Sequence, residues 1–425
     1  MTTATAALAH RLPAPTLFAY GAFGIPLAMA ALPLYVHLPK FYGDHLGLDL
    51  TLLGGVLLAL RLADGAIDPL LGVLSDRGGS RKRWLALAAP LLALGMVGLF
   101  RPLPRGEVAL VVWLGAMLAI VYFAFSLATI NHNAWGAELS PDPVERTRIT
   151  AVREGLALCG VVIASVLPSF LGGDDGGLGH FAILFAGFTF ACVAITLLGT
   201  PSGARPAVVS GHRPRLRDHI ARPLTDPLFR KLLVVFMLNG IAAAIPATLV
   251  LFFIADVLDA EAHQGLFLAL YFTAGAAGMP VWVRLSVRIG KPQAWLVAMG
   301  VAIAAFVWAS RLGAGDTRAF AVICVLSGVA LGADLALPPS LLADVIGRRG
   351  RMEGTGSYFG LWTLATKLNL SLAAGIALPL LEALGYRPGG RDAAALTALA
   401  FVYAFIPCLL KLGAAAALLG FQRSR

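Results

Sequence analysis

The sequence predicts an all-α polytopic membrane protein with twelve transmembrane helices in two pseudo-symmetric bundles of six. Three observations lead to this prediction. Of the 425 residues, 58% are hydrophobic and only 13% are charged, whereas soluble domains carry about 25% charged residues. Apolar runs of roughly 20 residues, the length that crosses a bilayer, recur along the chain. The third observation is that the two halves of the sequence match at a fixed offset.

The distribution of basic residues gives the topology. Loops after even-numbered spans are rich in Arg and Lys, and loops after odd-numbered spans hold few. Because short cytoplasmic loops carry the excess of basic residues, we expect both termini in the cytoplasm and the chain in a bacterial-type inner membrane. The same distribution favours topology signals over nucleic-acid binding as the reason for the net charge of +10. The expected spans are 16–38, 50–74, 84–101, 107–134, 149–171, 179–199, 230–257, 264–288, 293–311, 317–343, 355–381 and 394–421.

A polar stretch divides the chain near its middle. Residues 200–229 are rich in Pro, Gly and Arg. This composition predicts a linker on the cytoplasmic surface, as a loop with or without a short amphipathic helix. The N-terminal six-helix bundle would then occupy 1–199, and the C-terminal six-helix bundle would occupy 230–425.

An offset of 211 positions aligns the loop after the second span with the loop after the eighth. It matches Gly79 with Gly290 and Trp84 with Trp295. Such a match is typical of a duplicated six-span unit. The offset also separates architecture from function, because three charged residues of the second span have uncharged counterparts. Arg61, Asp64 and Asp68 fall opposite Phe272, Gly275 and Met279.

Those three charged residues are the candidates for a cation-coupling site. Arg61, Asp64 and Asp68 are spaced i, i+3 and i+7, so a helix places them on one face. A charged side chain at the bilayer centre costs about 2.5 to 3.5 kcal/mol on insertion scales. Chains keep such residues where they face a partner or a wet cavity, usually for transport. Two carboxylates one turn apart cannot both ionise cheaply in a low dielectric, so one is expected to take up and release a proton. The alternative is a structural Arg–Asp cluster that pins helices together.

The loop GVLSDRGGSRKRW, which starts at Gly72, predicts a tight cytoplasmic hairpin. Gly79 allows the turn. Asp76 can cap the next helix or pair with a basic residue, and the basic residues from Arg81 onward are expected to anchor at the membrane interface. We favour a gating or structural role over ligand contact for Gly72, Asp76, Arg77 and Arg81.

Polar and aromatic side chains in several spans are candidates for binding a substrate. Asn131, Asn133 and Trp135 end the fourth span, where they could line a hydrogen-bonding and stacking wall. Trp is also common near membrane faces for other reasons, and His132 between them is weak evidence for a proton relay. The full set of candidates is Asn131, Asn133, Trp135, Arg153, Asp334, Tyr358 and Trp362.

Lys367 lies midway along the eleventh span among apolar neighbours. A lone lysine there must pair or be neutral. A bond from Lys367 to Asp64 or Asp68 would explain both sets of charges, with Asp334 as the competing partner. Such a bond would make Lys367 part of the cation-coupling site.

Other classes of protein find little support in the sequence. No nucleophile–base pair or metal-ligand spacing stands out, so we expect no enzyme, no catalytic residue, no bound metal and no cofactor. The four cysteines are interpreted as small apolar fillers of the spans. The expected partners are a small-molecule substrate, a coupling cation and the lipid bilayer, with no nucleic acid, and the chain is expected to be a monomer.

Several of these motifs together resemble one known family, the glycoside–pentoside–hexuronide:cation symporters of the major facilitator superfamily, which contains melibiose permease. The resemblance implies two six-helix bundles that move a sugar-type solute with a cation by alternating access. It implies that Asp64 and Asp68 are the cation-site carboxylates, that Arg153 is a cavity arginine and that Lys367 is the cavity lysine near the cation. The motifs are GAFG at 21–24, RxxDxxxDP at 61–69, GVLSDR from Gly72, AELSPDxxERTR at 137–148, and LLADVIG with SYFGLWTxxxK within 341–367.

The chain departs from the family pattern at its ligand positions. Ile25 and Pro26 stand where sugar-binding members have a Lys–Asp pair, and Ile67 stands where they have an Asn before the second aspartate. The family's acidic residue of the fourth span is also absent. We therefore favour a proton over sodium as the coupling ion. An efflux carrier or a lysolipid or amphiphile transporter of the same fold stays open as an alternative, as does a non-transporting membrane assembly factor.

Overall fold

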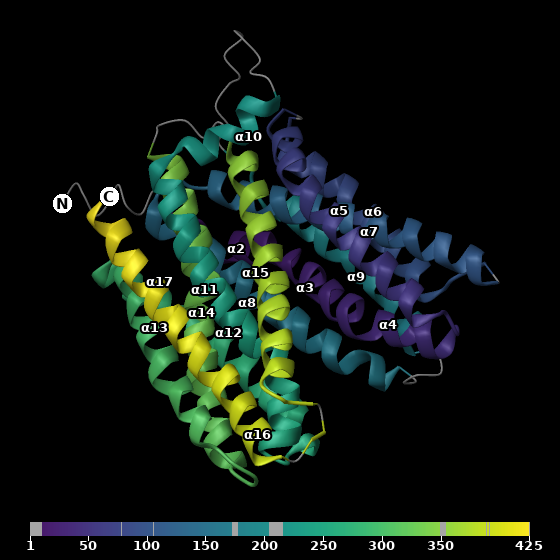
Figure 1. Ribbon diagram of the computed structural model, residues 1–425. Coiled ribbons are helices and arrows are strands. Elements are labelled where there is room, and N and C mark those ends of the chain that lie inside the picture. Colours follow the sequence, from purple (N-terminus) through teal and green to yellow (C-terminus); the bar gives the residue numbers. More distant parts are fainter. Residues whose placement is uncertain are drawn as a thin grey trace. The chain divides into compact units, whose positions relative to one another are not determined.

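A computed structural model describes residues 11–77, 79–104, 106–171, 177–203, 216–348, 354–387, 389–390 and 392–424. Throughout these residues the regular structure is helical, without a strand (Figure 1). Part of the predicted linker, residues 204–215, lies outside the described residues, as do some of the basic loop residues on which the topology depends.

The chain forms two compact units. Unit 1 comprises Met1–Ala221 with Ile346–Leu364, and unit 2 comprises Arg222–Val345 with Ala365–Arg425. The division falls within helix α15 (Thr355–Ala383), whose first residues belong to unit 1 and whose remainder belongs to unit 2. The predicted bundle boundaries at 199 and 230 stay a prediction. Of the two alternatives for the linker, the structure has the one with a short helix, α10 (Leu216–Thr225).

The first membrane segment of unit 1 is interrupted. Helix α2 ends at Ala22 and α3 begins at Gly24. Pro26 has no N–H to donate to the carbonyl of Ala22, so the helix cannot continue its regular ladder there. The helices of unit 1 are α2 (Ala14–Ala22), α3 (Gly24–Leu32), α4 (Leu38–Lys40), α5 (Leu50–Arg77), α6 (Arg81–Phe100), α7 (Glu107–Glu138), α8 (Pro143–Phe170) and α9 (Gly177–Gly199), with π-helical turns at Pro33–His37 and Phe41–His45.

Unit 2 is also built from long helices that follow one another along the chain. Its core is rich in aromatic side chains, among them Phe253 and Tyr403, whose rings stack with their centroids 4.2 Å apart. Besides α15, its helices are α11 (Pro227–Phe252), η4 (Phe253–Val257), η5 (Glu261–His263), α12 (Gln264–Ile289), α13 (Lys291–Phe306), η6 (Val307–Arg311), α14 (Thr317–Gly347), α16 (Ala393–Ala400), η7 (Phe401–Phe405) and α17 (Ile406–Arg423).

Helix lengths and composition agree with a membrane protein. Among the described residues, ten helices are long and apolar enough to cross a bilayer. Helices α5 and α8 complete the set of twelve; each is 28 residues long and carries five charged residues. Spanning helices keep such residues where they face a partner or a cavity. The prediction of a twelve-helix, all-α polytopic fold is confirmed.

The two repeats share their helix starts. Helix α6 begins at Arg81 and α13 at Lys291, and the turns before them contain Gly79 and Gly290 with φ of 84° and 87°. Only glycine adopts this conformation without strain, so the tight turn is kept in both repeats. This agreement supports the duplication that the offset of 211 indicates.

Candidate functional site

The two aspartates of α5 are buried within unit 1. Asp64 accepts a hydrogen bond from the Ser126 hydroxyl of α7 at 2.9 Å, and Asp68, one turn later, is fully buried. On the opposite face of the helix, Leu62 is 68% exposed. Since positions 64 and 68 share a face, α5 turns its carboxylates toward the protein, whereas Leu58, Leu62 and Leu70 are exposed. Arg61, one turn before Asp64, is partly buried.

Glycines bring α5 close to the first turns of α15 beside these aspartates. A Cβ at Gly360 would lie 2.7 Å from the carbonyl oxygen of Asp68, and a Cβ at Gly356 would lie 2.6 Å from that of Gly72. No side-chain carbon fits at such distances. Small residues let helix backbones approach closely in membranes, so the carboxylates of α5 adjoin a helix contact that depends on glycine.

Asp76 caps the helix at this contact. One carboxylate oxygen accepts the N–H of Gly356 at 2.7 Å, and the other accepts both the N–H and the hydroxyl of Ser357 at 2.8 Å. The first N–H groups of a helix have no partner inside it, so a carboxylate there satisfies them and complements the helix dipole. The expectation that Asp76 caps the next helix, α6, is wrong: it caps α15. The expected basic partner is Arg81, at 3.0 Å.

Arg81 continues a buried polar network from this cap. Its guanidinium pairs with Glu138 of α7 at 2.7 Å and also donates to the Ser75 hydroxyl. Ser75 in turn donates to the side-chain oxygen of Asn131 at 2.6 Å. Arg81 is thus buried in protein and does not anchor at the lipid interface as expected. Its neighbour Arg77, at the end of α5, is exposed.

Asn133 and Arg153 form a second polar group in unit 1. The guanidinium of Arg153, buried on α8, donates to the side-chain oxygen of Asn133 on α7 and pairs with Glu154. Both predicted binding residues therefore lie together, with Arg153 held between an amide and a carboxylate.

Trp135 and His132 are fixed inside unit 1. Trp135 is buried; its indole N–H donates to the carbonyl of Pro201 at 3.1 Å, and the Lys82 ammonium lies 5.5 Å from its ring centroid. The ring of His132 bonds to the backbone carbonyl of Tyr20 at 2.8 Å. Each of these side chains is thus held by a hydrogen bond to a backbone carbonyl of unit 1.

Unit 2 contains a polar cluster made by four helices. Asp334 of α14 pairs with Lys411 of α17 at 2.7 Å. The second carboxylate oxygen of Asp334 accepts the indole N–H of Trp295 of α13 at 2.7 Å, and Lys411 also donates to Asn239 of α11 at 2.7 Å. The side chains of Asp334 and Lys411 are only 12% and 10% exposed.

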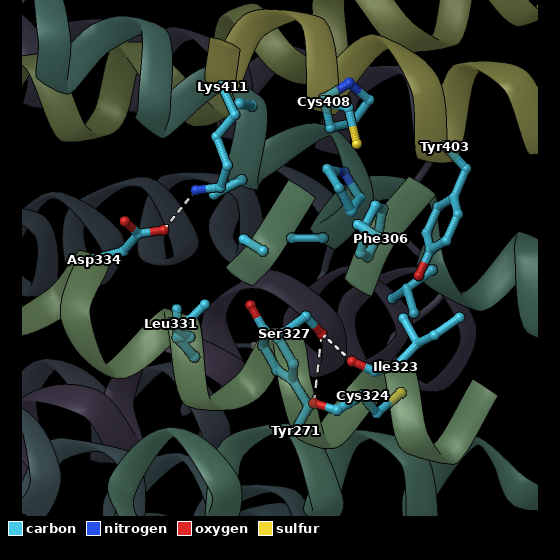
Figure 2. A pocket seen from close by; sticks show the side chains of 18 of the residues that line it. Tyr271, Phe306, Ile323, Cys324, Ser327, Leu331, Asp334, Tyr403, Cys408 and Lys411 are labelled. Carbon is cyan, nitrogen blue, oxygen red and sulfur yellow. Dashed lines mark hydrogen bonds and ion pairs between the residues drawn. The ribbon is translucent and has the colours of Figure 1, made fainter. Parts of the chain in front are cut away.

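This ion pair lines a cavity of about 170 Å³ within unit 2 (Figure 2). The lining comes from α11, α12, α13, α14, η7 and α17 and is mostly apolar. Figure 2 shows Lys411 and Asp334 facing each other on one side and Tyr403 with Phe306 on another. Tyr271 rises from α12 toward the middle of the cavity. The cavity thus combines a charged end with an aromatic wall.

A second buried ion pair in unit 2 has a counterpart in unit 1. Lys291, at the start of α13, pairs with Asp344 near the end of α14 at 2.6 Å and donates to the Ser340 hydroxyl at 2.7 Å. Unit 1 has a similar ion pair between the start of α6 and the end of α7, formed by Arg81 and Glu138, although the offset of 211 does not align these residues with Lys291 and Asp344. Because both repeats place an ion pair between these two helix ends, we assign it to the architecture.

Lys367 and the aromatic residues before it lie on α15. Lys367 is partly buried in unit 2, while Tyr358 and Trp362 are buried in the part of α15 that belongs to unit 1. The pairing of Lys367 with the aspartates of α5 stays a prediction. Asp334, considered as its other partner, pairs with Lys411.

Four residues of the clusters in unit 2 are not among the candidates predicted from the sequence: Lys411, Lys291, Trp295 and Asn239. The signal for Lys411 was available, because it is a lysine inside the last apolar span and the rule applied to Lys367 applies equally to it. Lys291 lies beside a loop, where a basic residue is expected from the topology alone. Trp295 stands out only as the repeat counterpart of Trp84, and nothing in the sequence sets Asn239 apart from other neutral residues of the spans.

Buried acid–base clusters inside membrane helices are typical of transporters. The chain belongs to the MFS/sugar transport protein family, whose model matches residues 17–422. The resemblance to sugar transporters of the major facilitator superfamily is thereby confirmed.

Individual relatives are similar along nearly the whole chain. An uncharacterized symporter of Synechocystis sp. is 22% identical over 95% of this chain and 93% of its own. The sphingosine-1-phosphate transporter MFSD2B of Mus musculus is 22% identical over 96% of this chain and 90% of its own. Among solved structures, a bacterial homologue of the iron transporter ferroportin superposes with a TM-score of 0.72 at 16% identity, covering 97% of this chain and 100% of that one.

Proposed function

We propose that this transporter couples movement of a small organic solute to a cation by alternating access, with Asp64 and Asp68 of α5 as the coupling site. The observation that carries the proposal is the burial of both carboxylates, one turn apart, on the face of α5 that is turned toward the rest of the protein. Two negative charges one turn apart in a low dielectric repel each other, and a bound cation relieves this repulsion. Relatives named as symporters support coupled transport.

A proton is the coupling ion that the site supports best. Sodium requires several oxygen ligands at once. The residue beside the second aspartate, Ile67, offers no side-chain oxygen that sodium could use. Entry of one proton contributes about 2.3 kcal/mol per 100 mV of membrane potential, enough to bias the transport cycle. We place the protein in a bacterial-type inner membrane with both termini in the cytoplasm, on the distribution of its basic loops.

The test is uptake into proteoliposomes driven by an imposed pH gradient, with melibiose and sphingosine 1-phosphate as separate probes. Asp64→Asn and Asp68→Asn should each reduce pH-driven uptake of the transported probe by tenfold or more. Asp49→Asn is the matched control, because it makes the same charge change at the exposed cap of the same helix, where an amide oxygen still accepts the N–H of Leu52. Unchanged pH-driven uptake in both test variants would contradict the coupling role.

An amphiphile is the second candidate for the solute. It is favoured by the sphingosine-1-phosphate transporter that aligns over 96% of this chain, and by Ile25 and Pro26, which replace a charged sugar-binding pair expected from the family resemblance. Uptake of the sphingosine 1-phosphate probe without uptake of melibiose would select this candidate. The reverse result would select a sugar.

A further inference from the structure

We propose that the cavity of unit 2 is a binding site for a neutral single-ring phenol, whose hydroxyl bonds to Asp334 and Lys411 while its ring packs against the aromatic wall. Every residue that lines the cavity belongs to unit 2, whereas the aspartates of α5 belong to unit 1. The site is therefore separate from the coupling site, and it does not depend on the ion coupling proposed above.

The size of the cavity limits its ligand to about one aromatic ring. Its volume is about 170 Å³. Pockets for drug-sized ligands measure about 300 to 1,000 Å³, whereas an apolar cavity of about 150 Å³ binds benzene. The space therefore accommodates a single ring with one small substituent, and it is too small for a disaccharide or a lysolipid.

The wall of the cavity favours an aromatic ligand. Four aromatic side chains of the wall are Phe267, Phe306, Phe320 and Tyr403. The rings of Phe267 and Phe320 already meet edge to face, with their centroids 4.9 Å apart, and this is one of the arrangements that aromatic rings prefer. Ser327, which also lines the cavity, donates its hydroxyl to a backbone carbonyl of its own helix at 2.6 Å and so demands nothing from a ring beside it.

The polar end of the cavity has hydrogen-bonding groups to spare. Lys411 donates to Asn239 and Asp334, and its ammonium has a further N–H. Asp334 accepts one bond on each carboxylate oxygen, and each oxygen can accept another. In the part of the chain that the structure describes, the hydroxyls of Tyr271 and Tyr403 have no hydrogen-bond partner, although both side chains line the cavity. Buried polar groups are normally hydrogen-bonded, so these groups are complementary to a polar group of a ligand.

The close spacing of the two charges selects a neutral hydroxyl. A ligand group with one charge gains from one member of the pair and is repelled by the other, 2.7 Å away. A hydroxyl is both a donor and an acceptor, so it can donate to Asp334 and accept from Lys411 at the same time. The pair therefore favours a phenol over a benzoate or a benzylamine, which have a similar ring and a single charge.

The architecture of the repeat does not require the charges at this cavity. The offset of 211 places Phe123 opposite Asp334. Helix α9, the last span of the first repeat, contains no Lys, Arg, Asp or Glu. Buried ion pairs can often be replaced by apolar residues without loss of stability. The pair of Asp334 and Lys411 is thus specific to the second repeat, as expected of groups that are kept for a ligand.

The experiment titrates the purified full-length protein in maltoside micelles with para-fluorophenol and follows binding by fluorine NMR. Fluorobenzene has the same ring without the hydroxyl, and para-fluorobenzoate and para-fluorobenzylamine carry one charge each. Binding of para-fluorophenol should saturate, unlike partition into micelles, with a Kd at least tenfold below that of each other probe. Absence of saturable binding, or a Kd for fluorobenzene equal to that for para-fluorophenol, would overturn the proposal.

Two independent variants locate the site. The double change Asp334→Leu with Lys411→Met removes both charges without leaving one unpaired, so para-fluorophenol should lose its tenfold advantage over fluorobenzene while the ring still binds. Ala243→Leu enlarges a side chain of the lining, one turn from Asn239 on the same face of α11, and should weaken the binding of both probes tenfold or more by filling the space. If both variants bind para-fluorophenol as the wild type does, the proposal is overturned.

Matched controls make the same changes away from the cavity. Ala269→Leu enlarges an exposed alanine of α12 outside the lining, and Lys291→Met with Asp344→Leu removes the other buried ion pair of unit 2, so both should bind para-fluorophenol as the wild type does. Loss of binding in Ala269→Leu would place the probe outside the cavity and overturn the proposal. Binding is measured without a gradient, so Asp64→Asn should keep it, and a failure of the proposed ion coupling is thereby distinguished from a failure of this site.

Discussion

Asp76 of α5 accepts two hydrogen bonds from Ser357, one from the backbone N–H and one from the hydroxyl, each at 2.8 Å. The two residues are 281 positions apart. A single carboxylate therefore joins the end of one membrane helix to the start of another, beside the close approach of Gly72 and Gly356. This contact combines a helix cap, a charge–dipole interaction and an ion pair with Arg81.

Replacing Asp76 should destabilise unit 1 more than loss of an ordinary cap does. Asp76→Ala removes the cap of α15, which costs about 1 to 2 kcal/mol, and it takes one partner from the buried Arg81. The control is Asp142→Ala, which removes the single N-cap bond to Val144 at 3.0 Å on α8. Thermal unfolding of the purified variants compares them. A fall in Tm for Asp76→Ala no larger than that for Asp142→Ala would show that the long-range cap contributes nothing extra.

Adding one methyl group at the helix contact should have the opposite effect to adding it elsewhere. A Cβ at Gly72 would overlap the carbonyl oxygen of Gly356, so Gly72→Ala should cost about 1 to 3 kcal/mol through forced separation of the helices. At Gly187, within α9, nothing lies within 4 Å of the added carbon. Gly187→Ala should therefore be neutral or stabilise by up to about 1 kcal/mol through helix propensity. Denaturation of the two variants side by side is the measurement, and a Gly72→Ala protein as stable as the wild type would rule out the close backbone contact.

The loop between α15 and α16 should make a pH-dependent contribution to stability. The hydroxyl of Tyr386 donates to Asp256, which also accepts the N–H of Gly389 at 3.1 Å. Burial, together with the hydrogen bond to the Asp256 carboxylate, raises the pKa of Tyr386 above its usual value. At neutral pH, Tyr386→Phe should lower stability by about 1 kcal/mol through loss of this bond.

The sign of the pH effect follows from the raised pKa of Tyr386. Above about pH 10 an unfolded tyrosine loses its proton, while the folded Tyr386 keeps its proton. Ionisation therefore stabilises the unfolded state of the wild type and lowers its free energy of unfolding. The difference in Tm between the wild type and Tyr386→Phe should therefore shrink as the pH rises through this range. Tm measured from neutral to alkaline pH tests this, and a difference that stays constant above pH 10 argues against the raised pKa.

The fold could be predicted from the sequence because every span must carry enough apolar residues to cross the bilayer. Apolar runs of about 20 residues and basic loops were enough to locate the helices to within a few residues. Helix α5, expected over 50–74, ends at Arg77, and α14, expected over 317–343, ends at Gly347. The ends differ because polar residues extend beyond the apolar core of each span and still continue the helix.

The partners of the charged residues could not be predicted in the same way. Sequence spacing shows which residues share a face of one helix, as it did for Asp64 and Asp68. It does not show which helix faces which. Asp334 was weighed against the lysine of the eleventh span, but its partner is Lys411 of the twelfth. For Asp76 the sequence left two roles open, a cap of the next helix or a pair with a basic residue; it pairs with Arg81 and caps a helix far along the chain.

The ion pair between the third and fourth helices of each repeat bears on how the two halves diverged. An ion pair joins these two helices in both repeats, formed by Arg81 with Glu138 in the first and by Lys291 with Asp344 in the second. The aspartates of α5 belong to the first repeat alone, and the Asp334–Lys411 pair belongs to the second. A tandem fusion of two copies of the first repeat would keep this ion pair in each copy and would have twice the aspartates of α5. Its final helix would contain no lysine, because α9 contains none. The two halves have thus diverged in their buried charged residues, although both keep the ion pair between their third and fourth helices.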